Sequence, residues 1–205
     1  MNSFKSIAVL FLICVISAVS LAIVNSSTSG PREENQRKNI EIAQMEILPD
    51  AIKNNLGQIE FVSEIKDSKI KYFKVLDKNN NVLAYIAETA EKGYSSDVKL
   101  LMSFDKEKNI LGVKPVSHSE TPGLGAKIEE INSAMSKKMK LKNKLVDEKK
   151  PWFCEQYKGL SSEKLILKKD NPSGGTIDAI TASTITSRAV TKALKKALEK
   201  FQTEN

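Results

Sequence analysis

The longest feature of the hydrophobic pattern is an apolar run close to the N-terminus. No residue from Ile7 to Val24 is charged, and only Cys14, Ser17 and Ser20 interrupt the apolar side chains. As a helix this run would rise about 27 Å, which is close to the roughly 30 Å hydrocarbon core of a bilayer. The pattern therefore predicts a single N-terminal transmembrane helix.

Two alternatives to an uncleaved anchor rest on the same residues. A secretory signal contains a similar apolar segment, and Ala18-Val19-Ser20 is a tolerable cleavage site, so removal of the segment remains open. The run is longer than a typical signal core and no Ala-x-Ala sequence follows it, which favours retention. Lipidation of Cys14 is excluded, because Ile13 is not small and most of the apolar run lies after the cysteine.

The chain becomes polar after this run and then regains apolar residues at helical spacing. Residues 25–30 are small and polar, and a charged stretch follows, so residues 1–30 are predicted to be a membrane anchor with its tether. Residues 31–205 suffice for one domain with a core and are too few for two. A helix is predicted over about 33–54 from its apolar positions. These are Ile40, Ile42, Ala43, Met45, Ile47 and Leu48.

The middle of the chain carries strand signals. Apolar runs at 69–77 and 82–87 flank an asparagine cluster at 79–81, which predicts a hairpin. The runs at 98–104 and 110–116 form a second pair. Connections this short favour antiparallel pairing, because a parallel crossover needs about a dozen residues or more.

Further elements follow the predicted sheet. Residues 126–138 are predicted to form a helix, 165–167 a short strand and 171–175 a loop. The last segment has one apolar face at spacings of three and one, which predicts an amphipathic helix. Its apolar residues are Val190, Ala193, Leu194, Ala197, Leu198 and Phe201. The sum is an α+β fold with an antiparallel sheet and flanking helices.

Charge and the rare side chains exclude several classes of site. The net charge is +7, and its lysines concentrate at 136–144 without interleaved aromatic residues, which argues against nucleic-acid binding and favours a solvated helix face. Cys14 in the apolar run cannot pair with Cys154, so there is no disulfide framework. With His118 as the only histidine and two separated cysteines, neither a histidine-rich metal site nor an iron–sulfur cluster is supported.

A segment rich in hydroxyl groups precedes the last helix. Six of the ten residues from Asp178 to Ser187 are Thr, Ser or Asp. Such residues are preferred helix N-caps, although a cap needs only one or two of them. The same helix N-terminus offers free N–H groups and a positive dipole end, which suit a phosphate group. From the residues alone, capping and phosphate binding both remain open.

This segment resembles the flavinylation motif of FMN-binding domains. These include the G subunit of the Rnf electron-transport complex and the C subunit of the sodium-pumping NADH:quinone oxidoreductase. Their pattern is Asp, two residues, Ser or Thr, Gly, Ala, Thr, and the last Thr receives the FMN phosphate. The resemblance implies that Asp178 and Thr181 belong to the site and that Thr184 is the covalent acceptor.

The match departs from the family pattern at two positions. Ala182 and Ser183 stand where Gly and Ala are usual. Both are small, so the backbone can still approach a phosphate closely. Ser183 also adds a competing hydroxyl. The resemblance implies that Ser183 and Ile185, which flank the acceptor, bind the cofactor with it.

A second segment resembles another part of the same family. Residues 118–125 contain Glu-Thr-Pro-Gly-Leu-Gly, which in the family forms a loop beside the flavin. Alone it would be a Pro-Gly turn. With the first motif about sixty residues away, the resemblance implies that this loop contacts the flavin through Glu120, Thr121, Gly123, Leu124 and Gly125. His118 is interpreted as structural or as a flavin neighbour, and residues 152–153 and 156–159 as core packing.

The resemblance also implies a function and a location. A covalent FMN would make the chain an electron-transfer subunit of the Rnf complex, in a path between ferredoxin and NAD that drives ion translocation. Its partners would be the other membrane subunits and a flavin transferase that cleaves FAD. Residues 31–205 would lie on the extracytoplasmic side of the bacterial inner membrane. The positive-inside count gives no help, since Lys5 precedes the anchor while Arg32, Arg37 and Lys38 follow it.

Two other functions remain open from the sequence. The chain could be a non-catalytic, membrane-tethered module whose basic face binds anionic envelope polymers. That hypothesis leaves the segment 178–187 unexplained. Alternatively, the FMN-binding domain could serve a different membrane reductase.

Overall fold

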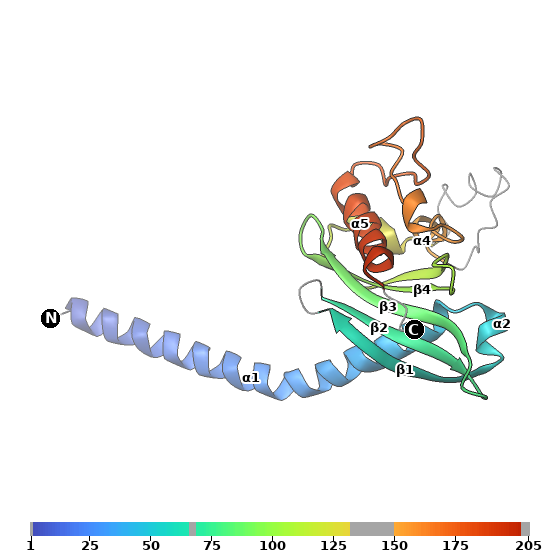
Figure 1. Ribbon diagram of the computed structural model, residues 1–205. Helices are drawn as coiled ribbons and strands as arrows, with labels where there is room; N and C mark the ends of the chain where they lie inside the picture. Colours follow the sequence, from blue (N-terminus) through green and yellow to red (C-terminus); the bar gives the residue numbers. More distant parts are fainter. Residues whose placement is uncertain (1, 66–68, 132–149, 202–205) are drawn as a thin grey trace. The chain divides into compact units, whose positions relative to one another are not determined.

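The computed structural model describes residues 2–65, 69–131 and 150–201 (Figure 1). The chain divides into two units, Met1–Ile42 and Ala43–Asn205, and each is described by itself. The predicted basic face at 136–144 lies outside the described residues.

Helix α1 runs without interruption over Asn2–Glu46. The segment Phe4–Glu46 is long and apolar enough to cross a membrane, and its apolar window is not buried in the structure. The prediction of a separate tether before a new helix is wrong, because residues 25–30 are helical and Pro31 lies inside α1. Hydroxyls of this polar stretch donate to carbonyls of the preceding turn, which satisfies the hydroxyls inside the helix. These bonds are Ser26 to Ile23, Thr28 to Val24 and Ser29 to Ser26.

The helix predicted over 33–54 is interrupted near its end. Helix α1 stops at Glu46, and a separate short helix, α2, spans Asp50–Lys53. Pro49 is the N-cap of α2, and the proline ring disfavours helical backbone at Leu48.

The second unit is built on an antiparallel sheet, as predicted, and this sheet has five strands. The strands follow one another in space in the order of the sequence, so each pairs with its neighbour in the chain. They are β1 Leu56–Ile65, β2 Ile70–Asp77, β3 Val82–Lys92, β4 Asp97–Phe104 and β5 Ile110–Ser117. The asparagine turn between β2 and β3 is confirmed, and the Asp77 carboxylate accepts the N–H groups of Asn79 and Asn81 there at 2.7 and 2.8 Å.

Strand β1 lies outside the predicted strands. Its partly buried positions recur every third residue, at Leu56, Ile59, Val62 and Ile65. Register shifts in its pairing with β2 break the usual alternation. Without period-two alternation, residues 56–65 lack the main pattern by which a half-buried strand is predicted.

The core lies between this sheet and helix α5, which spans Thr184–Lys200 and packs on β3 and β4 (Figure 1). The predicted apolar face of α5 is buried as expected. The Tyr72 hydroxyl of β2 donates to the carbonyl of Ala197 at 2.7 Å, and so ties the helix to the sheet. Helix α4, Trp152–Glu155, contributes the buried rings of Trp152 and Phe153, so their predicted role in core packing is confirmed.

Two shorter predictions are wrong in part. Instead of a helix from 126, the chain forms a single 3-10 turn, η2, at Gly125–Glu129, and the backbone is extended at Glu130. The carbonyl of Glu130 accepts the N–H of Trp152 at 3.3 Å, which ties the residue after η2 to α4. The remainder of the predicted helix, residues 132–138, lies outside the described residues.

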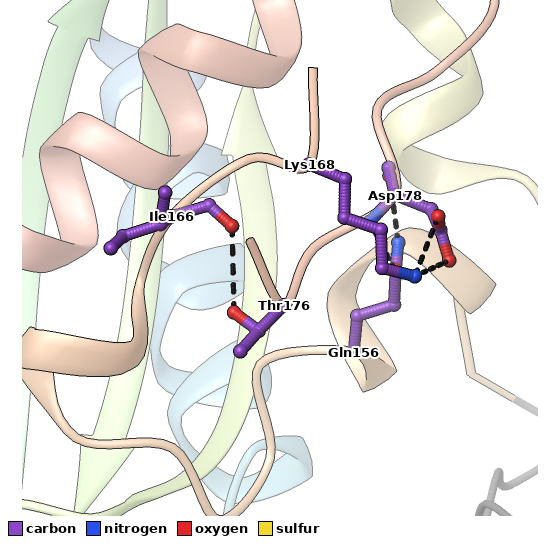
Figure 2. A network of polar contacts seen from close by, with 5 residues as sticks. All are labelled: Gln156, Ile166, Lys168, Thr176 and Asp178. Atoms are coloured by element: carbon purple, nitrogen blue, oxygen red, sulfur yellow. Dashed lines mark hydrogen bonds and ion pairs between the residues drawn. The ribbon is translucent and has the colours of Figure 1, made fainter. Parts of the chain in front are cut away.

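The strand predicted at 165–167 is reduced to one residue. The turn η3, Ser162–Lys164, precedes it, and Leu167 forms an isolated parallel bridge with Ile177. Beside this bridge the Thr176 hydroxyl donates to the Ile166 carbonyl at 3.4 Å (Figure 2). The predicted loop at 171–175 contains neither helix nor strand.

Candidate functional site

A pocket of about 530 Å³ lies at the start of α5. Three segments far apart in the sequence form its walls: the turn between β3 and β4, residues 120–125 and residues 182–186. Most of the residues that the two motifs predict line this pocket. They are Glu120, Thr121, Leu124, Gly125, Ser183, Thr184 and Ile185. The fold therefore brings both motifs to one place.

Three of the predicted site residues are not in the pocket lining. Asp178 is held by Lys168, whose ammonium donates to its two carboxylate oxygens at 2.8 and 2.9 Å (Figure 2). The side-chain amide of Gln156 exchanges hydrogen bonds with the Asp178 backbone at 2.8 and 3.1 Å. Thr181 is exposed, and Gly123 is exposed in a turn with φ 75°. Asp178 thus fixes the chain where it enters the hydroxyl-rich segment.

Glu120 is a buried carboxylate in the wall of the pocket, with 5% of its surface exposed. Its Oε2 accepts the Thr186 hydroxyl and the N–H of Tyr94, and its Oε1 accepts the N–H groups of Ser95 and Ser96 at 2.9 and 3.4 Å. Desolvation raises the pKa of Glu120, but these hydrogen bonds outweigh it and the pKa lies below its ordinary value. An ionised Glu120 therefore joins all three walls.

Two glycines, Gly125 and Gly93, lie so close to the Glu120 carboxylate that neither position has room for a side chain. A Cβ on Gly125 would lie 2.7 Å from Glu120 Oε2 and 2.7 Å from Thr186 Oγ1. A Cβ on Gly93, in the turn after β3, would lie 2.6 Å from Glu120 Oε1. The close packing around the Glu120 carboxylate is therefore enough to explain the glycine at position 125, whether or not a ligand is bound.

The start of α5 is held by its backbone and by Ser187. The Ser187 hydroxyl accepts the N–H of Ile180 at 3.0 Å and donates to the carbonyl of Ser183 at 2.9 Å. Ser183 is the N-cap, yet its side chain makes no cap hydrogen bond, and its buried Oγ has no partner among the described residues. Thr184, the first helical residue, is half-buried. The helix therefore begins with polar groups that a ligand can use.

The residue before the N-cap has a left-handed backbone. Ala182 has φ 61°, a conformation that costs a non-glycine residue roughly 1–2 kcal/mol. The family pattern has glycine at this position. The departure at Ala182 therefore keeps the turn into α5 but introduces local strain.

Several residues of the site carry no motif signal. The pocket lining also includes Tyr94, Ala182 and Thr186, and the ammonium of Lys169 donates to Thr184 Oγ1 at 2.9 Å. Three large side chains of the lining are exposed: Tyr94 by 70%, Leu124 by 42% and Ile185 by 49%. The pocket therefore offers apolar surface beside its polar groups. This combination fits a ligand with a phosphate and a planar aromatic ring, because the ring can cover the apolar surface.

His118 lies just before the pocket segment and outside the lining. Its ring is largely buried; Nε2 lies 3.3 Å from Glu129 Oε1, and Nδ1 accepts the N–H of Glu120 at 3.3 Å. These contacts join His118 to Glu120 and Glu129, beside the pocket. Over the part of the chain that the structure describes, no cluster of three or more His, Cys, Asp or Glu could hold a metal ion.

Known proteins resemble this chain over most of its length. Residues 93–199, more than half of the chain, match the FMN-binding domain family. The G subunit of the proton-translocating ferredoxin:NAD(+) oxidoreductase complex of Clostridium ljungdahlii is 28% identical over 93% of this chain and 86% of its own length. The G subunit of the ion-translocating oxidoreductase complex of Haemophilus influenzae is 33% identical over 75% of this chain and 68% of its own.

Among solved structures, the C subunit of the Na(+)-translocating NADH-quinone reductase from Parabacteroides distasonis is similar at 17% identity. The TM-score is 0.47, over 74% of this chain and 81% of that one. Both the domain match and the sequence relatives agree with the resemblance carried by the two motifs. The chain therefore belongs to the FMN-binding domain family, among the G subunits of ion-translocating oxidoreductase complexes.

Proposed function

We propose that this chain is the electron-transfer subunit of a membrane-bound ion-translocating ferredoxin:NAD oxidoreductase (Rnf) complex, with FMN bonded through its phosphate to Thr184. The observation that carries the attachment is the position of the Thr184 hydroxyl. Thr184 is the first residue of α5 and lines the pocket. Its oxygen therefore lies beside backbone N–H groups that have no intrahelical partner, at the positive end of the helix dipole.

The rest of the pocket suits the other parts of FMN. Tyr94, Leu124 and Ile185 expose apolar surface for the isoalloxazine ring, and Thr121 adds a hydroxyl to the lining. The hydrogen-bond donors around the ionised Glu120 carboxylate offset part of its repulsion of a phosphate. When bound, FMN supplies one- and two-electron transfer, while the protein provides binding and orientation.

The location and partners follow from the same proposal. Helix α1 anchors the chain in the bacterial inner membrane, and the flavin domain lies on the extracytoplasmic side. Covalent attachment suits that side, because FMN lost by dissociation could not readily be replaced there. The partners are the other membrane subunits of the complex and a flavin transferase.

Protease accessibility tests the orientation. Protease added to intact spheroplasts should digest the flavin domain and leave α1 in the membrane. Protection in spheroplasts, with digestion in inverted vesicles, would place the domain on the cytoplasmic side and reject this part of the proposal.

The attachment is tested by removing one oxygen. Thr184→Val keeps the branched side chain, so the domain should fold while covalent flavin disappears from the denatured protein in a gel under ultraviolet light. Thr181→Val makes the same change at an exposed residue of the motif that lies outside the pocket lining. It should weaken attachment without abolishing it, because its hydroxyl supports the site and is not the acceptor.

Mass spectrometry then locates the bond. The FMN adduct should lie on the peptide that contains Thr184, and fragmentation should assign it to that residue. An adduct on Ser183 or Thr186 would reject Thr184 as acceptor and keep the family function. Absence of any adduct, in a host that has the flavin transferase, would reject covalent attachment.

A further inference from the structure

We propose that Lys169 is a positioning residue for flavin attachment: it orients the Thr184 hydroxyl during transfer and afterwards pairs with the phosphodiester. This inference rests on the proposed attachment of FMN to Thr184. Lys169 lies between the bridge residue Leu167 and the loop at 171–175, outside both motifs. Its ammonium nevertheless donates a hydrogen bond to Thr184 Oγ1 at 2.9 Å.

The neighbours of Lys169 leave its charge available. Asp170, next in the chain, is held by Arg188, whose side-chain nitrogens donate to it at 2.5 to 3.1 Å. These bonds are the main reason that the pKa of Asp170 lies below its ordinary value. Asp178 is held in the same way by Lys168. Among the described residues Lys169 itself is in no ion pair. Its charge contributes to the lowered pKa of Asp170, but Arg188 is the main partner of that carboxylate, so the Lys169 ammonium can still pair with an incoming anion.

A second, independent observation points to an anion at the same place. Ser183 precedes Thr184, lines the pocket and is only 7% exposed. Its Oγ has no hydrogen-bond partner among the described residues. A buried hydroxyl without a partner is destabilising, and a phosphate oxygen would accept a hydrogen bond from it. Lys169 and Ser183 thus supply two side-chain donors around the oxygen that would carry the phosphate.

The transfer step uses these donors in a defined way. The Thr184 oxygen forms a bond to the FMN phosphorus of FAD, the pyrophosphate P–O bond breaks, and AMP leaves with the bonding electrons. The hydroxyl proton passes to a base of the flavin transferase. Lys169 donates to one lone pair of the oxygen and leaves the other for phosphorus, and its charge stabilises the negative charge that develops there. In the product, the same ammonium faces a phosphodiester anion.

The test measures flavin incorporation into the purified full-length chain in detergent, with flavin transferase and FAD. Lys169→Gln keeps a hydrogen-bond donor and removes the charge, and should slow the initial rate about tenfold, the effect of losing one charge-assisted hydrogen bond. Lys169→Arg should restore most of the rate. Lys106→Gln, an equal charge change on the exposed β4–β5 turn, should match the unmodified chain. Equal melting temperatures would exclude a folding effect.

A spectroscopic measurement separates electrostatic pairing from a structural role. In the flavinylated protein, the ³¹P resonance of the phosphodiester should shift in Lys169→Gln and return in Lys169→Arg. An unchanged rate and resonance in Lys169→Gln, while Thr184→Val takes up no flavin, would overturn the role of Lys169 and leave the attachment site intact. Failure of the unmodified chain to take up flavin at Thr184 would overturn both.

Discussion

Replacing Glu120 by glutamine removes a charge from the wall of the pocket with little change in shape. In the native chain, each carboxylate oxygen accepts hydrogen bonds: Oε1 from Ser95 and Ser96, and Oε2 from Thr186 and Tyr94. A glutamine offers one carbonyl oxygen and one NH₂ group. Whichever way the amide turns, its NH₂ faces a backbone N–H that also donates.

The expected loss follows from this count. A hydrogen bond to a charged group contributes about 1.5–3 kcal/mol, and a buried donor left without a partner costs about 1–3 kcal/mol. Because Thr186 can rotate its hydroxyl to accept from the amide, only part of this loss is realised. We expect Glu120→Gln to lower the free energy of unfolding at pH 7 by about 2–3 kcal/mol. For a domain of this size, that lowers the melting temperature by about 4–12 °C.

The loss should depend on pH in a defined direction. The pKa of Glu120 is lowered in the folded state from an ordinary value of 4.5. Its ionised form therefore stabilises the fold fully above pH 4.5, and this contribution is lost as the pH falls through the lower folded value. Glutamine does not titrate. The difference in stability between the two proteins should be largest at neutral pH and should shrink in acid.

Urea unfolding at several pH values measures both effects. Trp152, the one tryptophan of the sequence, is buried in the core and reports on the domain by fluorescence. Glu107→Gln is the control, because Glu107 is exposed in the β4–β5 turn; it should leave the unfolding free energy within about 0.5 kcal/mol. Equal stability of Glu120→Gln and native protein at pH 7, or a difference that grows in acid, would refute the assigned role of Glu120.

Three further substitutions probe the same pocket. Ala182→Gly should relieve the left-handed strain and raise stability by about 0.5–1 kcal/mol after the added flexibility of the unfolded chain is subtracted, measured by urea unfolding; a loss of stability would contradict it. Gly125→Val should push on Glu120 and Thr186, cost about 1–3 kcal/mol, and disturb the flavin's absorption and potential while the covalent bond remains; an unchanged flavin spectrum and potential would argue against contact. Ser183→Ala should retain covalent flavin by in-gel fluorescence, and its loss would favour Ser183 as acceptor.

The sequence predicts the fold best where burial follows a simple period. The strands β2 to β5 and the apolar face of α5 carry regular patterns and appear where expected. Strand β1 does not, because irregular pairing removes its alternation. The break between α1 and α2 depends on Pro49 acting against an apolar pattern that continues across it. Strand pairing and the backbone restriction at proline decide these two cases, and the spacing of hydrophobic residues does not reveal either of them.

The sequence likewise predicts the site residues that lie close together in the chain and misses those that only folding brings to the pocket. Each motif identifies a wall of the pocket, because the residues of each lie close together in the chain. Tyr94 and Lys169 reach the site through the β3–β4 turn and through the chain after Leu167, and no spacing in the sequence relates either residue to Thr184. Only the folded chain shows that a lysine contacts the predicted acceptor.

The hydroxyl groups before and within the first turn of α5 differ in their partners and in their exposure, and these differences support Thr184 as the acceptor. The Thr186 hydroxyl donates to Glu120, and the Ser187 hydroxyl bonds to two backbone groups, so both hydroxyls are committed to the fold. Thr181 lies outside the pocket lining. Ser183 lines it but is almost fully buried, whereas Thr184 is half-buried and already contacts a cation. A nucleophile must be reached by its substrate as well as held in place, and of these hydroxyls Thr184 meets both conditions.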